Sequence, residues 1–168
     1  MIATNINLLK PVMPNRAKLM EALGEVFDSG VLNEGEKVYE FERQLRKLIE
    51  TQNLICVSSG TAALDLALKE SGVFTGTEVI TTSLTAEPTN TTITANGAVP
   101  VFADVCPRSG LLTAHSILQK ITDKTRAIVV VHYGGYPAEI VEISKVCAEY
   151  DISLIEDCAH ALYASVDG

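Results

Sequence analysis

Short runs of β-branched and apolar residues alternate with helical patterns from residue 54 onward, and this alternation constrains the fold most strongly. The runs predict strands at residues 54–57, 78–81, 100–103, 127–132 and 152–155. Helical spacing between several of them predicts helices at residues 62–71, 116–121 and 138–150. Strands that alternate with helices form βαβ units. The sequence therefore predicts an α/β fold with a mostly parallel sheet and flanking helices.

Two helices are expected before this region. The first apolar stripe ends at Ser29-Gly30, and it consists of Leu19, Leu23, Val26 and Phe27. The second follows Gly35, and it consists of Val38, Phe41, Leu45 and Leu48. An apolar stripe on an otherwise charged helix normally packs against a core. We therefore expect N-terminal helices in residues 1–53 and an α/β part in residues 54–168.

Charge and composition limit the partners of this 168-residue chain. Its 13 basic and 21 acidic residues give a net charge of −8, which argues against nucleic acid or an anionic membrane as a partner. A phosphorylated ligand remains possible because backbone N–H groups can bind phosphate. The apolar strip at 127–131 is too short to span a bilayer. Four scattered cysteines and no export signal in residues 1–10 predict a cytoplasmic location without a zinc site.

The ends of the expected strands are the places to look for chemistry, because ligands of parallel sheets bind beyond the carboxyl ends of the strands. Ser59-Gly60-Thr61-Ala62 joins the first strand to a helix. Gly60 permits close backbone approach, and the N–H groups of Thr61 and Ala62 are expected to be free, so that they form a phosphate cup with the Thr61 hydroxyl. The alternative is a serine or threonine helix cap without a ligand.

A second strand end carries Asp157, followed three residues later by His160. An aspartate at this place can hold a protonated ring nitrogen, as a pyridoxal phosphate site requires. The alternative is a helix cap and a packed or solvated histidine. Glu156 alternates away from Asp157 and is expected to be structural. His132, Asp157 and His160 also make up the ligand set of a non-haem iron site, although the match is weak.

In this order, the pieces resemble the DegT/StrS sugar aminotransferases, which are pyridoxal phosphate enzymes of fold type I. The resemblance covers essentially the whole chain. It rests on Lys10-Pro11, residues 29–35, Phe41-Glu42, residues 59–64, Glu78-Val79-Ile80, residues 100–105, residues 132–138 and residues 155–161. The family implies a partial large domain of a fold type I aminotransferase.

The resemblance implies a role for each matching position. Thr61 and Ala62 bind the phosphate of pyridoxal 5'-phosphate, and Gly60 shapes the cup. Asp157 pairs with the pyridinium nitrogen. His160 lies where the family places a glutamine or histidine near the ring hydroxyl.

Ala86 stands where many family members stack an aromatic residue on the cofactor ring, and alanine cannot stack. Glu87-Pro88 also replaces the small residues that are usual there. Both departures predict that the cofactor is held more loosely or differently.

The family's reaction needs a lysine that forms a Schiff base with the cofactor and shuttles a proton. The resemblance places that lysine beyond Asp157, after a serine, and the sequence ends at Gly168. None of the lysines present matches the position; they are Lys10, Lys18, Lys37, Lys47, Lys69, Lys120, Lys124 and Lys145. We therefore interpret residues 1–168 as a truncated cofactor-binding large domain without the small domain.

The resemblance implies transfer of an amino group from an amino acid, typically glutamate, to a keto-sugar nucleotide. Because no lysine matches the Schiff-base position, we expect the chain to be inactive alone. The alternative function is a non-catalytic or partner-dependent module that binds the cofactor or a sugar nucleotide. The resemblance also implies a homodimer, whereas the alternative function includes pairing with a complementing C-terminal half.

Overall fold

A computed structural model describes residues 11–166 and divides the chain into two units. The division falls between Cys56 and Val57, whereas the sequence places it between residues 53 and 54. None of the helices described has the length and apolar composition that crossing a bilayer requires.

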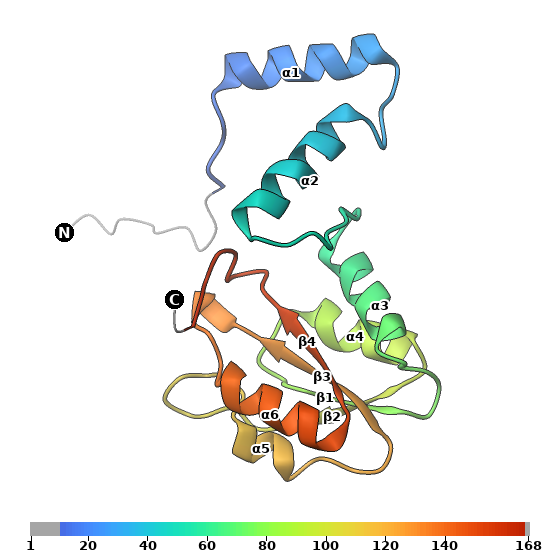
Figure 1. The fold of residues 1–168 in the computed structure, drawn as a ribbon, viewed down its shortest axis with the longest axis vertical. Helices are drawn as coiled ribbons and strands as arrows, with labels where there is room; N and C mark the ends of the chain where they lie inside the picture. The colour runs from blue at the N-terminus through green and yellow to red at the C-terminus, as the bar shows by residue number, and fades with distance from the viewer. Residues whose placement is uncertain (1–10, 167–168) are drawn as a thin grey trace, which may run out of the picture. The chain divides into compact units, whose positions relative to one another are not determined.

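The N-terminal unit contains two helices, α1 (Arg16–Ser29) and α2 (Glu36–Leu48) (Figure 1). Asn15 caps α1, because its side chain accepts hydrogen bonds from two N–H groups of the first turn. Gly30, with a φ of 68°, ends α1 in the left-handed conformation that favours glycine. Both helices are therefore confirmed. Neither helix holds a buried residue within the described residues, and packing of the α2 stripe against a core stays a prediction.

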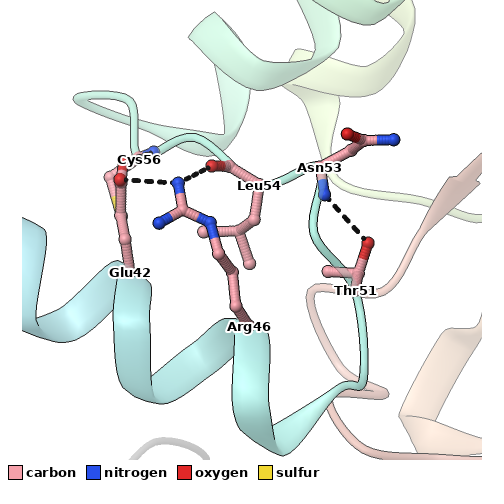
Figure 2. Close-up of polar contacts among 6 residues, drawn as sticks. All are labelled: Glu42, Arg46, Thr51, Asn53, Leu54 and Cys56. Atoms are coloured by element: carbon pink, nitrogen blue, oxygen red, sulfur yellow. Dashed lines mark hydrogen bonds and ion pairs between the residues drawn. The ribbon is translucent and has the colours of Figure 1, made fainter.

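The strand expected at residues 54–57 is not formed. Instead, side chains of α2 bind the backbone of this segment (Figure 2). Glu42 Oε1 accepts a hydrogen bond from the Cys56 N–H at 2.8 Å. Arg46 Nη2 donates to the Leu54 carbonyl at 2.6 Å and to Glu42 Oε2 at 3.0 Å. Backbone groups that a neighbouring strand would satisfy are thus satisfied by α2.

The second unit is built on a four-stranded sheet with the order β2-β1-β3-β4. All three pairs of neighbouring strands are parallel. The strands are β1 (Glu78–Thr81), β2 (Val99–Phe102), β3 (Thr125–Val131) and β4 (Ser153–Asp157). These correspond to four of the five expected strands, and the bounds of β1 are unchanged. The predicted α/β architecture with a parallel sheet is confirmed.

Helices cover both faces of this sheet (Figure 1). They are α3 (Gly60–Glu70), α4 (Glu87–Ala95), α5 (Ala114–Leu118) and α6 (Ile140–Tyr150). A short 3-10 turn, η1 (Tyr133–Gly135), follows β3. Three of the helices were expected from the sequence, whereas α4 was not.

Two apolar clusters explain this layering. Along β1 the side chains alternate, with Val79 in the cluster under α3 and α4 and Ile80 in the cluster under α5 and α6. Along β3, Val129 and Val130 divide between the same two clusters. All four side chains are fully buried. A strand covered on both faces is apolar throughout, which is the pattern that residues 127–131 show.

Polar contacts hold α4 against the end of β1. Thr81 Oγ1 donates to Asn90 Oδ1 at 2.9 Å, and Asn90 Nδ2 donates to the Thr82 carbonyl at 3.1 Å. Thr92 is buried, and its hydroxyl donates to the carbonyl of Pro88 at 2.6 Å. Threonine has a low helix propensity, so the tertiary contacts of Asn90 with Thr81 and Thr82, rather than local preference, specify the helix.

Candidate functional site

A cavity of about 520 Å³ lies within the second unit, beyond the carboxyl end of β4. Three segments line it: the start of α3, the start of α4 and the end of β4 with the residues that follow. Its lining includes Gly60, Thr61, Ala86 and Asp157 from the predicted site. Ala62 and His160 are outside the lining. The location agrees with the rule that ligands bind where parallel strands end.

The start of α3 offers backbone donors to this cavity, but they are not the pair expected. Ser59 caps the helix, and its hydroxyl oxygen accepts the Ala62 N–H at 3.1 Å. The N–H of Ala62 is therefore not free, which corrects the prediction. Within residues 11–166, the N–H groups of Gly60 and Thr61 have no hydrogen-bond acceptor.

The space beside these donors is open. A Cβ atom placed on Gly60 would meet no other atom within 4 Å. The first-turn N–H groups of a helix carry partial positive charge, and an anion placed there is stabilised. Gly60 and Thr61 thus form a cradle that fits a phosphate group.

Asp157 lies at the end of β4, and its carboxylate is half-buried. Oδ1 accepts a hydrogen bond from the Ala159 N–H at 3.1 Å. Oδ2 accepts one from the Thr89 hydroxyl at 3.4 Å. An ionised carboxylate has no proton and can only accept hydrogen bonds. The cavity therefore presents an acceptor suited to a protonated nitrogen.

His160 is held by the turn that follows β3. Its Nδ1 accepts the Gly134 N–H at 3.2 Å, which leaves the proton of the neutral ring on Nε2. The ring of Tyr133 packs edge-on against it, with the ring centroids 5.5 Å apart. The imidazole is exposed to solvent. The structure therefore gives His160 a defined orientation beside η1 but no place in the cavity wall.

The described residues do not bring His132, Asp157 and His160 together as a group of iron ligands. His132 is 4% exposed, and both ring nitrogens are hydrogen-bonded within the protein. Nδ1 accepts the Ala138 N–H at 3.1 Å, and Nε2 lies 3.0 Å from Glu156 Oε2. Among the described residues, no group of three histidine, cysteine or acidic side chains is arranged to hold a metal. His132 and Glu156 form a structural pair, as expected for Glu156.

Ala86 and the two residues after it start α4 at the edge of the cavity. Ala86 occupies the cap position, Glu87 begins the helix and Pro88 lies in its first turn. Proline is favoured there because its missing N–H would have no partner. The position of Glu87-Pro88 in the first turn of α4 therefore explains why a proline is accommodated there. Pro88 also lines the cavity.

Cys158 lines the cavity beside Asp157, and its thiol responds to the acidic charges there. Burial, followed by the charges of Glu156 and Asp157, raises the pKa of the Cys158 thiol. The thiol therefore stays protonated at neutral pH and is not a nucleophile there.

Comparisons with known proteins agree with this geometry. Residues 15–168 match the model of the DegT/DnrJ/EryC1/StrS aminotransferase family. The chain is 36% identical over 146 residues to the spore coat polysaccharide biosynthesis protein SpsC of Bacillus subtilis, covering 87% of this chain and 38% of that protein. It is 33% identical over 165 residues to the dTDP-4-dehydro-2,3,6-trideoxy-D-glucose 4-aminotransferase of Saccharopolyspora spinosa. This match covers 97% of this chain and 42% of that protein.

A solved structure shows the same fold. The aminotransferase TlmJ from Streptoalloteichus hindustanus superposes with a TM-score of 0.89 and 36% identity, over 98% of this chain and 45% of that one. The chain thus spans about two fifths of the length of the curated relatives it matches. The expected partial large domain of a fold type I aminotransferase is confirmed. The chain belongs to the DegT/DnrJ/EryC1/StrS aminotransferase family.

Proposed function

We propose that this chain is the cofactor-binding part of a pyridoxal phosphate-dependent aminotransferase, which transfers an amino group from an amino acid such as glutamate to a keto-sugar nucleotide. Family membership and the name of the Saccharopolyspora spinosa relative support the reaction and the substrate class. One observation carries the proposal. The Asp157 carboxylate and the unpaired N–H groups of Gly60 and Thr61 face one cavity.

The residues present fit this cofactor. A cavity of about 520 Å³ is within the range of small-molecule sites, roughly 300–1,000 Å³. Gly60 and Thr61 would hold the phosphate, and Asp157 would hold the ring nitrogen. When bound, the cofactor supplies an electron sink for the carbon that carries the amino group.

The chain's own residues make two contributions in this proposal. Asp157 accepts a hydrogen bond from the ring nitrogen and keeps the proton on that atom. The N–H groups of Gly60 and Thr61, with the Thr61 hydroxyl, bind the phosphate through neutral donors. Among residues 11–166, no lysine or arginine lines the cavity, so in this proposal these donors stand in for a cationic side chain.

The lysine that the family's chemistry requires is likewise not in the lining contributed by the described part of the chain. We therefore propose that residues 1–168 bind the cofactor but do not catalyse amino transfer alone. The competing proposal is a module that depends on a partner, either a second copy of the chain or a complementing C-terminal half. A cytoplasmic location also remains a prediction from the sequence.

Binding of pyridoxal 5'-phosphate to the purified 168-residue chain, followed by absorbance, tests the proposal. Asp157→Asn should weaken binding by about 10- to 100-fold, because a hydrogen bond to a charged group contributes about 1.5–3 kcal/mol. Asp151→Asn is the matched control, because Asp151 ends α6 in a left-handed conformation that asparagine also adopts.

Pyridoxal, which lacks the phosphate, should bind more weakly than the phosphate ester to the unsubstituted chain. Equal affinities of the two compounds would contradict the role of Gly60 and Thr61. Equal affinity of pyridoxal 5'-phosphate for the Asp157→Asn variant and the unsubstituted chain would contradict the role of Asp157.

A further inference from the structure

Thr89 is a buried hydroxyl-bearing residue in the wall of the cavity. It lies in the first turn of α4 and is 1% exposed. Its Oγ1 is 3.4 Å from Asp157 Oδ2 and 2.9 Å from Thr85 Oγ1. Neither threonine was singled out from the sequence, since Thr89 and Asp157 are 68 residues apart.

The direction of these hydrogen bonds follows from the number of protons. A hydroxyl has one proton, and an ionised carboxylate has none to give. The Thr89 proton therefore goes to Asp157 Oδ2, and Thr85 must donate to Thr89. A donor that itself accepts a hydrogen bond is polarised, which strengthens its own donation. Thr85, Thr89 and Asp157 thus form a chain of donors that ends on the carboxylate.

The backbone around Thr89 is well supported. The Thr89 N–H donates to the Ala86 carbonyl at 3.1 Å, which starts the helix. The next residue, Asn90, binds both Thr81 and Thr82 at the end of β1. A hydroxyl carried by a helix that is bonded to the sheet has a fixed position relative to β4, which is part of the same sheet.

The separation of 3.4 Å is long for an O–H···O hydrogen bond. The Ala159 N–H binds the other oxygen, Oδ1, so the carboxylate has one hydrogen-bond donor at each oxygen and its rotation is restricted by both.

We propose that Thr89, oriented by Thr85, is a positioning residue that turns the Asp157 carboxylate toward the ring nitrogen of the cofactor. This inference rests on the proposed function and adds two residues to the site. It requires that Thr89, through Asp157, affect only the contact with the ring nitrogen and no contact with another part of the ligand.

Two ligands separate that role from a general loss of structure. One is pyridoxal 5'-phosphate, and the other is its 1-deaza analogue, in which a C–H group replaces the ring nitrogen. Thr89→Val should weaken binding of pyridoxal 5'-phosphate by about three- to tenfold and leave binding of the analogue unchanged. Thr89→Ser, which keeps the hydroxyl, should restore the affinity. Thr85→Val should show a smaller loss of the same kind.

Thr91→Val is the matched control on the same helix. Thr91 is exposed, and its hydroxyl donates to the Glu87 carbonyl within α4. Combining Thr89→Val with Asp157→Asn should cause no further loss beyond Asp157→Asn alone, because Thr89 acts through Asp157. An additive loss, or an equal loss for the deaza analogue, would overturn the proposal.

A measurement without any ligand separates this proposal from the proposed function. The carbon-13 chemical shift of the Asp157 carboxyl group should change in Thr89→Val and return in Thr89→Ser. An unchanged shift means that the contact does not exist, and the positioning role is then wrong even if the cofactor binds as proposed. If the carbon-13 shift changes but pyridoxal 5'-phosphate and its deaza analogue bind with equal affinity, Asp157 does not contact the ring nitrogen. The positioning role is then wrong as well.

Discussion

At the scale of single residues, environment separates functional from structural side chains. Asp157 has an open cavity in front of it, whereas His132 has both ring nitrogens occupied by Ala138 and Glu156. The sequence identifies both as polar residues at the ends of apolar strands. It does not reveal which of them lines a cavity, because that depends on which loops pack beside each strand.

Ala86 carries a prediction about cofactor affinity. Ala86→Phe places an aromatic ring at the edge of the cavity, where the resemblance implies stacking. Aromatic pairs contribute about 0.5–1.5 kcal/mol beyond burial of their area, so affinity for pyridoxal 5'-phosphate should rise by about 2- to 10-fold. Equilibrium dialysis measures this change. Ala95→Phe, at the other end of α4, is the control, and an equal gain there would contradict stacking.

The cysteines carry a prediction about reactivity and pH. Hydrogen bonds from the backbone of Arg108 and Ser109 lower the pKa of the Cys106 thiol. Burial, followed by the charges of Glu156 and Asp157, raises that of Cys158. Since only the thiolate reacts, Cys106 should be alkylated by iodoacetamide at lower pH than Cys158.

Peptide mass spectrometry of samples alkylated between pH 6 and pH 9, roughly the range in which thiols ionise, checks this order. By residue surface area Cys158 is exposed, although its thiol is partly buried, and Cys106 is only half-exposed, so access alone would give the opposite order. Faster alkylation of Cys158 would therefore show that exposure, and not ionisation, decides.

At the scale of elements, the sequence predicts what local patterning specifies. The four strands of the sheet were predicted because their apolar runs are short and bounded by turn residues. Helix α4 was missed because its threonine-rich sequence is stabilised by contacts of Asn90 with the end of β1 rather than by helix propensity. Residues 54–57 have the composition of a strand, but their backbone binds Glu42 and Arg46.

That binding leads to a prediction for the segment after α2. Glu42→Ala removes the acceptor of the Cys56 N–H, so exchange of this amide with solvent should accelerate by about tenfold or more. Hydrogen exchange followed by nuclear magnetic resonance measures it. Glu40→Ala is the control, since Glu40 pairs with Arg43 and Gln44 on the helix surface. Unchanged exchange in Glu42→Ala would show that another contact protects the amide.

At the scale of the whole molecule, charge and site chemistry are consistent. The excess of acidic residues, 21 against 13 basic ones, gives −8, yet the proposed ligand carries a phosphate. An acidic chain can still bind a phosphate through the neutral N–H groups at the start of α3, because these groups attract an anion locally without changing the net charge. The contribution of Thr89 could not be predicted, because its contact with Asp157 exists only when α4 and β4 are both in place.

The lining of the cavity also couples ligand binding to the integrity of the sheet. The starts of α3 and α4 and the end of β4 meet only in the folded chain, so a ligand that needs all three binds no unfolded molecule. By mass action, a ligand at 100 times its Kd then adds about 2.7 kcal/mol to the free energy of unfolding. The supply of cofactor would thus govern how long the folded protein survives heat and proteolysis, before any substrate is present.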